Sequence, residues 1–280
     1  MDGKRPTSFY VLGGFFLLFL VFLYGPTITI GILSFQGPQG GLTFPMRGTS
    51  LHWFRELFQT QAVGDIWGSF RRSFALGLMV MVTTVVLSIM GGLAFRRRFA
   101  GSTVLFYIIM ASLVIPSILV SLGVGLIFSQ LGWNVHWATS GYGAQLTWTL
   151  PFGLLIMFAV FNRFNPAYEE AARDQGASGW QVFVHIVLPL IAPSLIGVAL
   201  FGFTLSYDEF ARTLLTSGSR NTLPLEIFGM TTNVTTPVLY ALGTLTTLFS
   251  LSIILVFIVV ALLVQRRRAR LGSDAGKGLV

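Results

Sequence analysis

The sequence contains two pairs of adjacent carboxylates that are candidates for binding a partner protein or a cation. They are Glu169-Glu170 and Asp208-Glu209, in a 280-residue chain with only 10% charged residues. A carboxylate can accept charge-assisted hydrogen bonds from a partner protein, or replace part of the hydration of an ammonium group. Tyr207, next to the second pair, adds an aromatic face that attracts cations. The alternative for each pair is structural: helix capping for the first, and a solvated helix end for the second.

Motifs for catalysis and metal binding are absent from the sequence. It has no Cys and only three scattered His residues, so neither a disulfide framework nor a metal-ligand cluster is expected. It contains no G-x-x-x-x-G-K-[ST] phosphate loop, no G-x-S-x-G and no H-E-x-x-H. We therefore expect a protein that is not an enzyme and holds no cofactor. If it drives transport with ATP, the ATPase must be another subunit.

Long apolar runs flank both carboxylate pairs and are expected to hold them in place. Hydrophobic residues make up 54% of the chain and the mean hydropathy is +0.76, values typical of a membrane protein rather than a soluble domain. A helix needs about 20 apolar residues to cross a bilayer core. Six runs of that length contain no charged residue, and they are 9–35, 73–95, 102–128, 142–161, 186–207 and 238–264. We predict an all-α membrane protein with six transmembrane helices. The lack of ionisable residues within them disfavours an ion-coupled carrier.

The basic residues indicate how these runs are oriented. If the N-terminus is cytoplasmic, twelve of the 18 Lys and Arg residues fall on the cytoplasmic side and six outside, as the positive-inside rule requires. Both termini are therefore predicted to be cytoplasmic. The triplets Arg96-Arg97-Arg98 and Arg266-Arg267-Arg268 each end a run on that side, where they would meet anionic lipid headgroups. The positive charge thus marks topology, and nucleic-acid binding is not expected.

The predicted outer side carries amphipathic and aromatic features. Residues 36–72 form the longest polar stretch, and residues 51–58 within it have the pattern of a short amphipathic helix at the membrane surface. Interfacial aromatic residues are expected at Trp133, Trp137 and Trp148. Candidate kinks within the runs are Pro116, Pro151 and Pro193.

The predicted cytoplasmic loop, residues 162–185, holds the first carboxylate pair and has strong helix signals. The dipeptide Asn165-Pro166 can begin a helix whose first turn contains both glutamates, where negative charge suits the helix dipole. Gly176 ends this helix. Ser178, with Gln181 three residues later, has the spacing of a capping box that begins a second helix. The loop is predicted to be helix, glycine, helix, which by itself is also a common structural connector.

The sequence from this loop into the fifth run resembles a known signature. Glu170-Ala171-Ala172, Gly176 and Ile186-Val187-Leu188-Pro189 are similar to the EAA-x3-G-x9-I-x-L-P loop of binding-protein-dependent ABC importer permeases, with every signature position filled. The resemblance implies the type I ABC importer permease fold. It divides the chain into a first helix and outer loop (1–68), a five-helix core (69–264) and a basic cytoplasmic tail (265–280).

The same resemblance implies a role for the loop and a set of partners. In that family the loop contacts a cytoplasmic ATPase and transmits its closure to the spans. The partners would be two ATP-binding subunits, a second, homologous permease subunit and an extracytoplasmic solute-binding protein, at the bacterial inner membrane. The ATPase-coupling residues would be Glu170, Ala171, Ala172, Gly176, Ile186, Leu188 and Pro189. For His185 and Trp180 we expect only an interfacial position.

The segment after the fifth run resembles one subfamily, the permeases of spermidine and putrescine importers. The shared pattern is Ser206-Tyr207-Asp208-Glu209-Phe210, Thr216-Ser217-Gly218, residues 222–227 and, in the outer loop, 51–58. The fifth run, at about 1.5 Å per residue, is long enough to place the carboxylates near the outer mouth of the path. A polyamine path is therefore expected at Tyr207, Asp208 and Glu209. Permeases for opines, aminophosphonates or ferric iron are alternatives, as is, less favourably, a channel or ion-coupled carrier that needs no ATPase.

Overall fold

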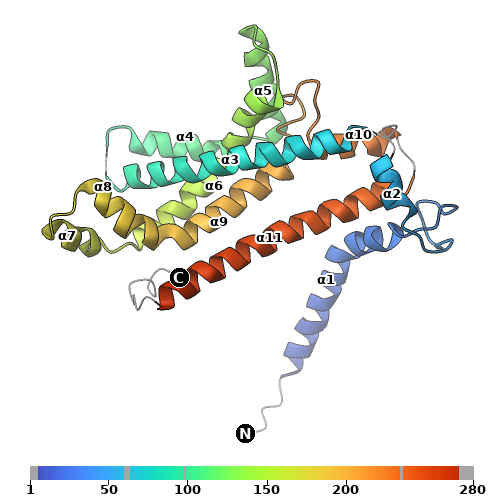
Figure 1. Cartoon of the computed structure of the whole chain (residues 1–280), viewed down its shortest axis with the longest axis horizontal. Helices are drawn as coiled ribbons and strands as arrows, with labels where there is room; N and C mark the ends of the chain where they lie inside the picture. Colours follow the sequence, from blue (N-terminus) through green and yellow to red (C-terminus); the bar gives the residue numbers. More distant parts are fainter. Residues whose placement is uncertain (1–5, 60–63, 98, 234–235, 271–280) are drawn as a thin grey trace. The chain divides into compact units, whose positions relative to one another are not determined.

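The computed structural model describes residues 6–59, 64–97, 99–233 and 236–270, and these residues form helices joined by loops (Figure 1). Arg98 and residues 271–280, which belong to a predicted basic triplet and to the predicted tail, lie outside the described residues. The chain divides into two compact units. One contains Met1–Gly64 and Ile227–Leu251, and the other contains Asp65–Glu226 and Ser252–Val280. The boundaries at 68 and 264 stay predictions.

Five helices in the described ranges are long and apolar enough to cross a membrane. They are α1 (Thr7–Leu33), α3 (Ile66–Phe95), α6 (Tyr142–Asn162) with the π-helical turn η2 (Trp137–Gly141) before it, α9 (Leu188–Tyr207) with α8 (Gly179–Val182) and η3 (Phe183–Val187) before it, and α11 (Val238–Arg270). Helix α3 differs from prediction at its start, because it begins seven residues before Ser73. Asp65 caps this helix by accepting the N–H of Gly68 at 2.9 Å, so it extends past the charged residues that bounded the apolar run.

The remaining predicted span, residues 102–128, is a bent pair of helices rather than a single helix. It forms α4 (Ser102–Val114) and α5 (Ser117–Gln130), which meet at 110°. Pro116 lies at the break and has no N–H to donate to the carbonyl of Ser112, four residues earlier. A proline also disfavours helical backbone in the residue before it, and Ile115 is extended. With this pair counted as one span, the six predicted spans are confirmed.

The helices α3, α6 and α9 lie side by side and form the core of the unit that begins at Asp65 (Figure 1). Small side chains at the interface let helix backbones approach closely. On α3 the buried small residues recur about every four positions, at Ser69, Ser73, Gly77, Thr84, Ser88 and Gly92. The Thr84 and Thr149 hydroxyls share a hydrogen bond of 2.8 Å between α3 and α6. Both α6 and α9 continue through their prolines, Pro151 and Pro193.

The other unit contains α2 (His52–Gln59), which is the amphipathic helix predicted at 51–58. Its Trp53 and Leu57 are buried. The loop before it is organised by the buried amide of Gln36, whose Oε1 accepts the N–H of Arg47 at 2.7 Å. Residues 36–59 of the predicted polar stretch are therefore an ordered part of this unit, because the amphipathic helix and a buried amide give them a core of their own.

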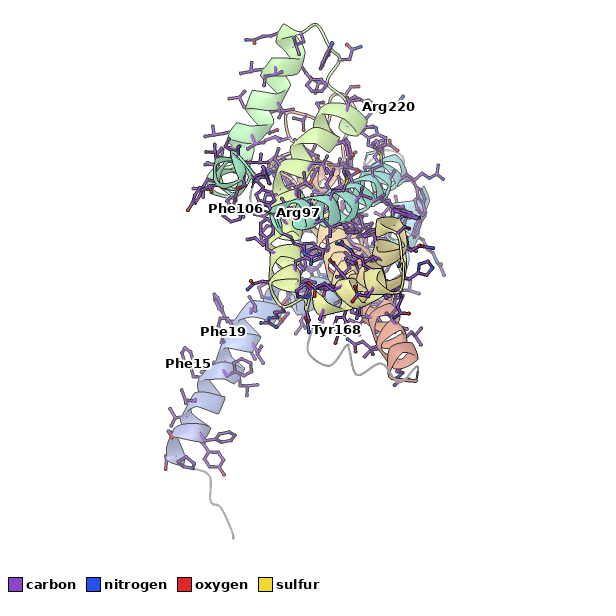
Figure 2. All side chains as sticks on the ribbon, turned by 90° about the vertical axis from the view of Figure 1, so that its left-hand side faces the viewer. Phe15, Phe19, Arg97, Phe106, Tyr168 and Arg220 are labelled. Carbon is purple, nitrogen blue, oxygen red and sulfur yellow. The ribbon has the colours of Figure 1, made fainter. Side chains whose placement is uncertain are left out.

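Helix α1 exposes nearly all of its apolar side chains. Figure 2 shows Phe15 and Phe19 projecting away from the helix, and they are 71% and 49% exposed. A large exposed apolar surface is unfavourable in water, whereas in a bilayer the same side chains contact acyl chains. The surface of α1 is therefore that of a helix surrounded by lipid.

Candidate coupling loop and outer site

The candidate coupling loop, residues 162–185 and called the coupling loop below, begins with the helix that its capping residues predict. Helix α7 (Ala167–Asp174) follows Asn165, whose Oδ1 accepts the N–H of Ala167 at 3.0 Å. Pro166 already has helical dihedral angles, and its fixed φ suits this position. Both glutamates of the first carboxylate pair lie in the first turn, where their charge is stabilised by the helix dipole.

Gly176 ends α7 in the manner that the sequence predicts. Its φ is +82°, a left-handed conformation that costs residues with a side chain about 1–2 kcal/mol. The N–H of Ala177 donates to the carbonyl of Ala172 at 3.1 Å, and that of Gly176 to the carbonyl of Arg173 at 2.8 Å. These two bonds define a Schellman cap, which reverses the chain direction at the glycine.

A capping box begins the second half of the loop. The Ser178 Oγ accepts the N–H of Gln181 at 3.4 Å, and the Gln181 Oε1 accepts the N–H of Ser178 at 2.8 Å. From here α8 and η3 continue into α9 without a break. His185 Nδ1 lies 3.0 Å from the carbonyl oxygen of Gln181, and Trp180 is 72% exposed. A force applied to α8 therefore reaches a transmembrane helix directly.

The signature residues divide between an exposed face and a packed face of the loop. Glu170 and Ala171 are exposed on α7, whereas Ala172 and Ile186 pack against the buried cluster below the loop. Leu188 and Pro189 are the first two residues of α9. A hollow of about 310 Å³ opens between α7 and α8 beside Gly176, Gln181 and His185. An exposed carboxylate next to a small side chain and a hollow is a surface that a partner can approach closely.

The second carboxylate pair lies at the end of α9, where its members contact different groups. Tyr207 is buried, and its ring stacks on Phe203 with centroids 5.7 Å apart. Asp208 is exposed at the helix end, yet nearby protein removes part of its water and raises the pKa of its carboxyl. The Glu209 Oε1 accepts the N–H of Arg212 at 3.0 Å. The structure brings these residues to one helix end but gives each different neighbours, and their role in a path stays a prediction.

Arg212 is a candidate that the sequence places only in an outer loop. Its side chain is fully buried, with Cζ 4.7 Å from the centroid of the Trp148 ring. Its Nη2 lies 3.4 Å from the carbonyl oxygen of Ser112, which is the carbonyl that Pro116 leaves without its helical donor. The guanidinium thus supplies a donor at the break between α4 and α5. No local pattern could reveal this pairing, because Ser112 and Arg212 are 100 positions apart.

The segment after α9, residues 208–222 and called the outer segment after its predicted side, packs along both halves of the bent span. The N–H of Leu215 donates to the Ser121 Oγ of α5 at 2.9 Å. The Ser140 Oγ of η2 donates to the carbonyl of Thr216 at 2.8 Å. The buried polar residues of this segment are Arg212, Thr213, Thr216, Ser217 and Thr222. Because Ser121 and Ser140 form hydrogen bonds with its backbone, the outer segment is packed against the helices of this unit.

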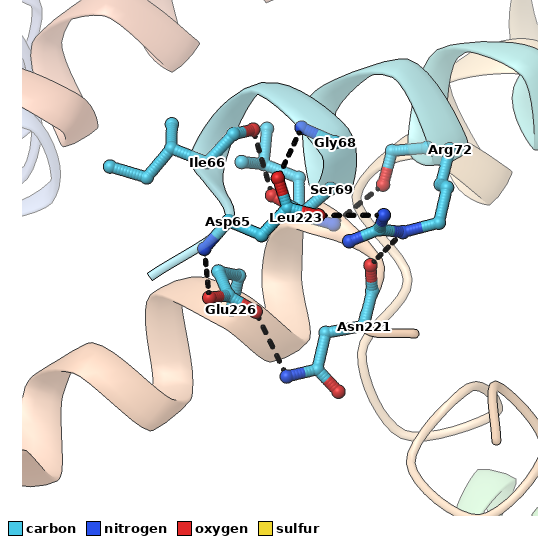
Figure 3. Close-up of polar contacts among 9 residues, drawn as sticks. Asp65, Ile66, Gly68, Ser69, Arg72, Asn221, Leu223 and Glu226 are labelled. Carbon is cyan, nitrogen blue, oxygen red and sulfur yellow. Dashed lines mark hydrogen bonds and ion pairs between the residues drawn. The ribbon is translucent and has the colours of Figure 1, made fainter. Parts of the chain in front are cut away.

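A polar network joins the end of the outer segment to the start of α3 (Figure 3). The Arg72 Nη1 pairs with the Asp65 Oδ2 at 2.9 Å, and its Nε donates to the carbonyl of Asn221 at 2.6 Å. Glu226 accepts the N–H of Asp65 and an N–H of the Asn221 side chain, both at 2.9 Å. The hydrogen bond from Arg72 holds the pKa of Asp65 below its usual range. This network fixes the start of α10 (Leu223–Asn233) against α3.

Comparison with known proteins identifies the class to which this fold belongs. The family model of the binding-protein-dependent transport system inner membrane component matches residues 84–270. The spermidine/putrescine transport system permease protein PotC of Haemophilus influenzae is 26% identical over 254 residues, 89% of this chain and 95% of the relative. The putrescine transport system permease protein PotI of Escherichia coli K12 is 30% identical over 237 residues, 82% of this chain and 83% of the relative. A crystal structure of a bacterial ABC transporter involved in the import of the acidic polysaccharide alginate has a TM-score of 0.69 and 17% identity, over 92% of this chain and 98% of that chain.

The chain belongs to the family of binding-protein-dependent transport system inner membrane components. It is a permease component of an ABC importer and a multi-pass protein of the bacterial inner membrane. The coupling loop and the bent span lie within the matched region, whereas α1 and α2 precede it. The predicted class and the type I permease fold are confirmed.

Proposed function

We propose that this chain forms half of the translocation path of an ATP-driven importer whose solute is a polyamine such as putrescine or spermidine. Two relatives that cover most of the chain are polyamine permeases, which supports this substrate class. The carboxyl of Asp208, exposed but partly dehydrated at the end of α9, is a group that an ammonium would stabilise. Selection of the solute is shared with a separate extracytoplasmic binding protein.

The proposal that ATP is hydrolysed in other subunits rests on the coupling loop. Two cytoplasmic ATP-binding subunits would contact the exposed Glu170-Ala171 face of α7, one through this chain and one through a second, homologous permease subunit. The supporting observation is that this capped surface helix continues through α8 and η3 into α9. This arrangement requires both chain termini to be cytoplasmic, as the distribution of basic residues predicts.

Uptake of radiolabelled putrescine and spermidine, in cells with and without this chain, tests the substrate. Deletion should abolish uptake, and unchanged uptake of both compounds would contradict the polyamine assignment. Glu170→Arg should abolish transport and association of the ATPase. Gly176→Asp should do the same because a side chain is strained at φ +82°, whereas Gly179→Asp, in ordinary helical backbone, is the matched control. Normal transport by Glu170→Arg in cells lacking the ATPase subunit would instead support a channel.

A further inference from the structure

An ion pair joins the coupling loop to the end of α3. The Arg96 Nη1 lies 2.6 Å from the Glu169 Oε1. Arg96 is the C-cap residue of α3, and Glu169 is in the first turn of α7. The two side chains are 24% and 15% exposed, so both are partly shielded from water by the surrounding protein.

The same guanidinium lies against two aromatic rings. Its Cζ is 5.3 Å from the ring centroid of Phe161 and 5.2 Å from that of Phe164, distances at which a cation is attracted by an aromatic face. Phe161 is in the last turn of α6, Phe164 lies between α6 and α7, and both are buried. Arg96 therefore contacts the end of α6 and the start of α7 from the end of α3.

A hollow lies beside the ion pair, between the coupling loop and α3. Its volume is about 680 Å³, and its lining includes Leu93 and Arg97 from the α3 side and Arg173 and Trp180 from the loop. Apolar side chains of α3 and of α8 pack on one buried cluster, but α7 has no fully buried residue. The ion pair is therefore a direct polar contact by which α7 itself is held to α3.

The two adjacent glutamates of α7 have different surroundings. Glu169 is turned to Arg96, whereas Glu170 is exposed. Successive residues of a helix are about 100° apart around its axis, so one glutamate can pair inside the chain while the other stays available to a partner. The family signature includes Glu170 and not its neighbour, so Glu169 has no role assigned by the resemblance.

We propose that Arg96 and Glu169 are positioning residues for coupling: their ion pair carries the movement of α7, driven by the ATPase, into α3. This inference rests on the proposed function of the coupling loop. Helix α3 has 30 residues, packs with small side chains against α6 and α9, and carries at its other end the network of Asp65 and Arg72. A displacement at Arg96 is therefore transmitted over about 45 Å to the outer segment.

The test uses the complete transporter, with its ATPase, second permease and binding protein, in proteoliposomes. The variants are Glu169→Gln, Arg96→Gln and the double variant, with Arg97→Gln as the matched control. We expect normal ATPase content and basal hydrolysis in every variant. The number of ATP molecules hydrolysed per imported putrescine should rise at least about fivefold in both single variants, because coupling free energies between two sites usually correspond to a factor of about five or more. The double variant should be no worse than either single variant, because both remove the same interaction.

A second measurement needs no solute. This chain has no Cys, so Arg220→Cys gives it a single thiol, on the outer segment, and labelling is followed on this chain after the subunits are separated (Arg220 is labelled in Figure 2). In the otherwise unchanged transporter, trapping the ATPase closed with ATP and vanadate should change the rate at which maleimide labels this thiol. Glu169→Gln should abolish that change while the ATPase still closes. If Arg96→Gln does not assemble, Glu169→Gln on the surface helix carries both measurements.

The outcomes separate the inference from the proposed function. The inference is wrong if Glu169→Gln keeps the normal number of ATP molecules hydrolysed per putrescine and the normal ATP-dependent labelling. It is also wrong if the effects of Glu169→Gln and Arg96→Gln on that number add in the double variant. If Glu170→Arg loses the ATPase while Glu169→Gln stays coupled, the loop is the ATPase contact and only the role of the ion pair is wrong. If Glu170→Arg keeps both ATPase binding and transport, the proposed function of the loop fails as well.

Discussion

Replacing Gly153 with alanine should destabilise the helix core, although alanine is the better helix former. Gly153 lies on α6 and faces α3. A Cβ at this position would overlap the Oγ of Ser88, and would lie 3.0 Å from the Thr84 Cγ2 and 3.2 Å from the Ser88 Cβ. Rotation of the Ser88 hydroxyl relieves only the first of these contacts, so the two helices must also move apart.

The expected size of the effect follows from two opposing contributions. Overpacking a close helix interface costs about 1–3 kcal/mol. Replacing glycine by alanine inside a helix returns about 0.5–1 kcal/mol, because it reduces the conformational entropy of the unfolded chain. Taken at the middle of their ranges, the two contributions leave a net loss of about 1 kcal/mol for Gly153→Ala. At about 2–4 °C for each kcal/mol, the Tm should fall by about 2–5 °C.

Thermal unfolding of the purified transporter in detergent measures this effect, with two matched variants. A Cβ at Gly197 of α9 has no other atom within 4 Å, so Gly197→Ala should keep or raise the Tm. Ser88→Gly removes the opposing side chain, so the double variant Gly153→Ala with Ser88→Gly should recover most of the loss. If Gly153→Ala raises the Tm as Gly197→Ala does, α3 and α6 are not packed as closely as described.

Three further predictions concern the capping box, the outer segment and the network of Figure 3. Ser178→Ala should destabilise the start of α8 by about 1 kcal/mol, seen as faster amide hydrogen exchange around residues 179–182; unchanged exchange would mean that the capping box is not formed. Arg212→Gln removes the cation over Trp148 and the donor to Ser112. The rate of amide hydrogen exchange in residues 208–222 should therefore rise about tenfold or more, since hydrogen bonds to charged groups contribute about 1.5–3 kcal/mol. Arg212→Lys should give an exchange rate between those of the unchanged protein and Arg212→Gln, and an unchanged rate in Arg212→Gln would contradict the role of the guanidinium. Because the pKa of Asp65 is lowered in the folded protein, its contribution is present above the ordinary value of 3.8 and is lost as the pH falls through the folded pKa. Because the Asp65 carboxylate is exposed, this contribution to the free energy of unfolding should be below about 1 kcal/mol. In Asp65→Asn the Tm should fall less steeply as the pH is lowered below about 4, and the dependence of Tm on pH between 5 and 8 should be unchanged.

Features that depend on neighbouring residues could be predicted from the sequence. The helix ends of the coupling loop are examples: Asn165, Gly176 and Ser178 act through hydrogen bonds to backbone groups within five positions. The apolar runs are equally local, because a bilayer requires their length and composition whatever their partners are. The start of α3 was missed for a local reason too. Charged residues ended the apolar run, but Asp65 caps a helix that extends beyond it.

Local signals were therefore enough to predict the membrane spans, the capped loop and, through the signature, the class of protein. Packing of the helices was needed to show which glutamate of the pair contacts Arg96 and which is exposed, that Arg212 is buried at the break of the bent span, and that the helices meet there at 110°. Glu169 and Arg96 are 73 positions apart, and Arg212 and Ser112 are 100 apart. Such pairs form only after the helices have packed, because the geometry of the interface, and not a local pattern, brings the donor to its acceptor.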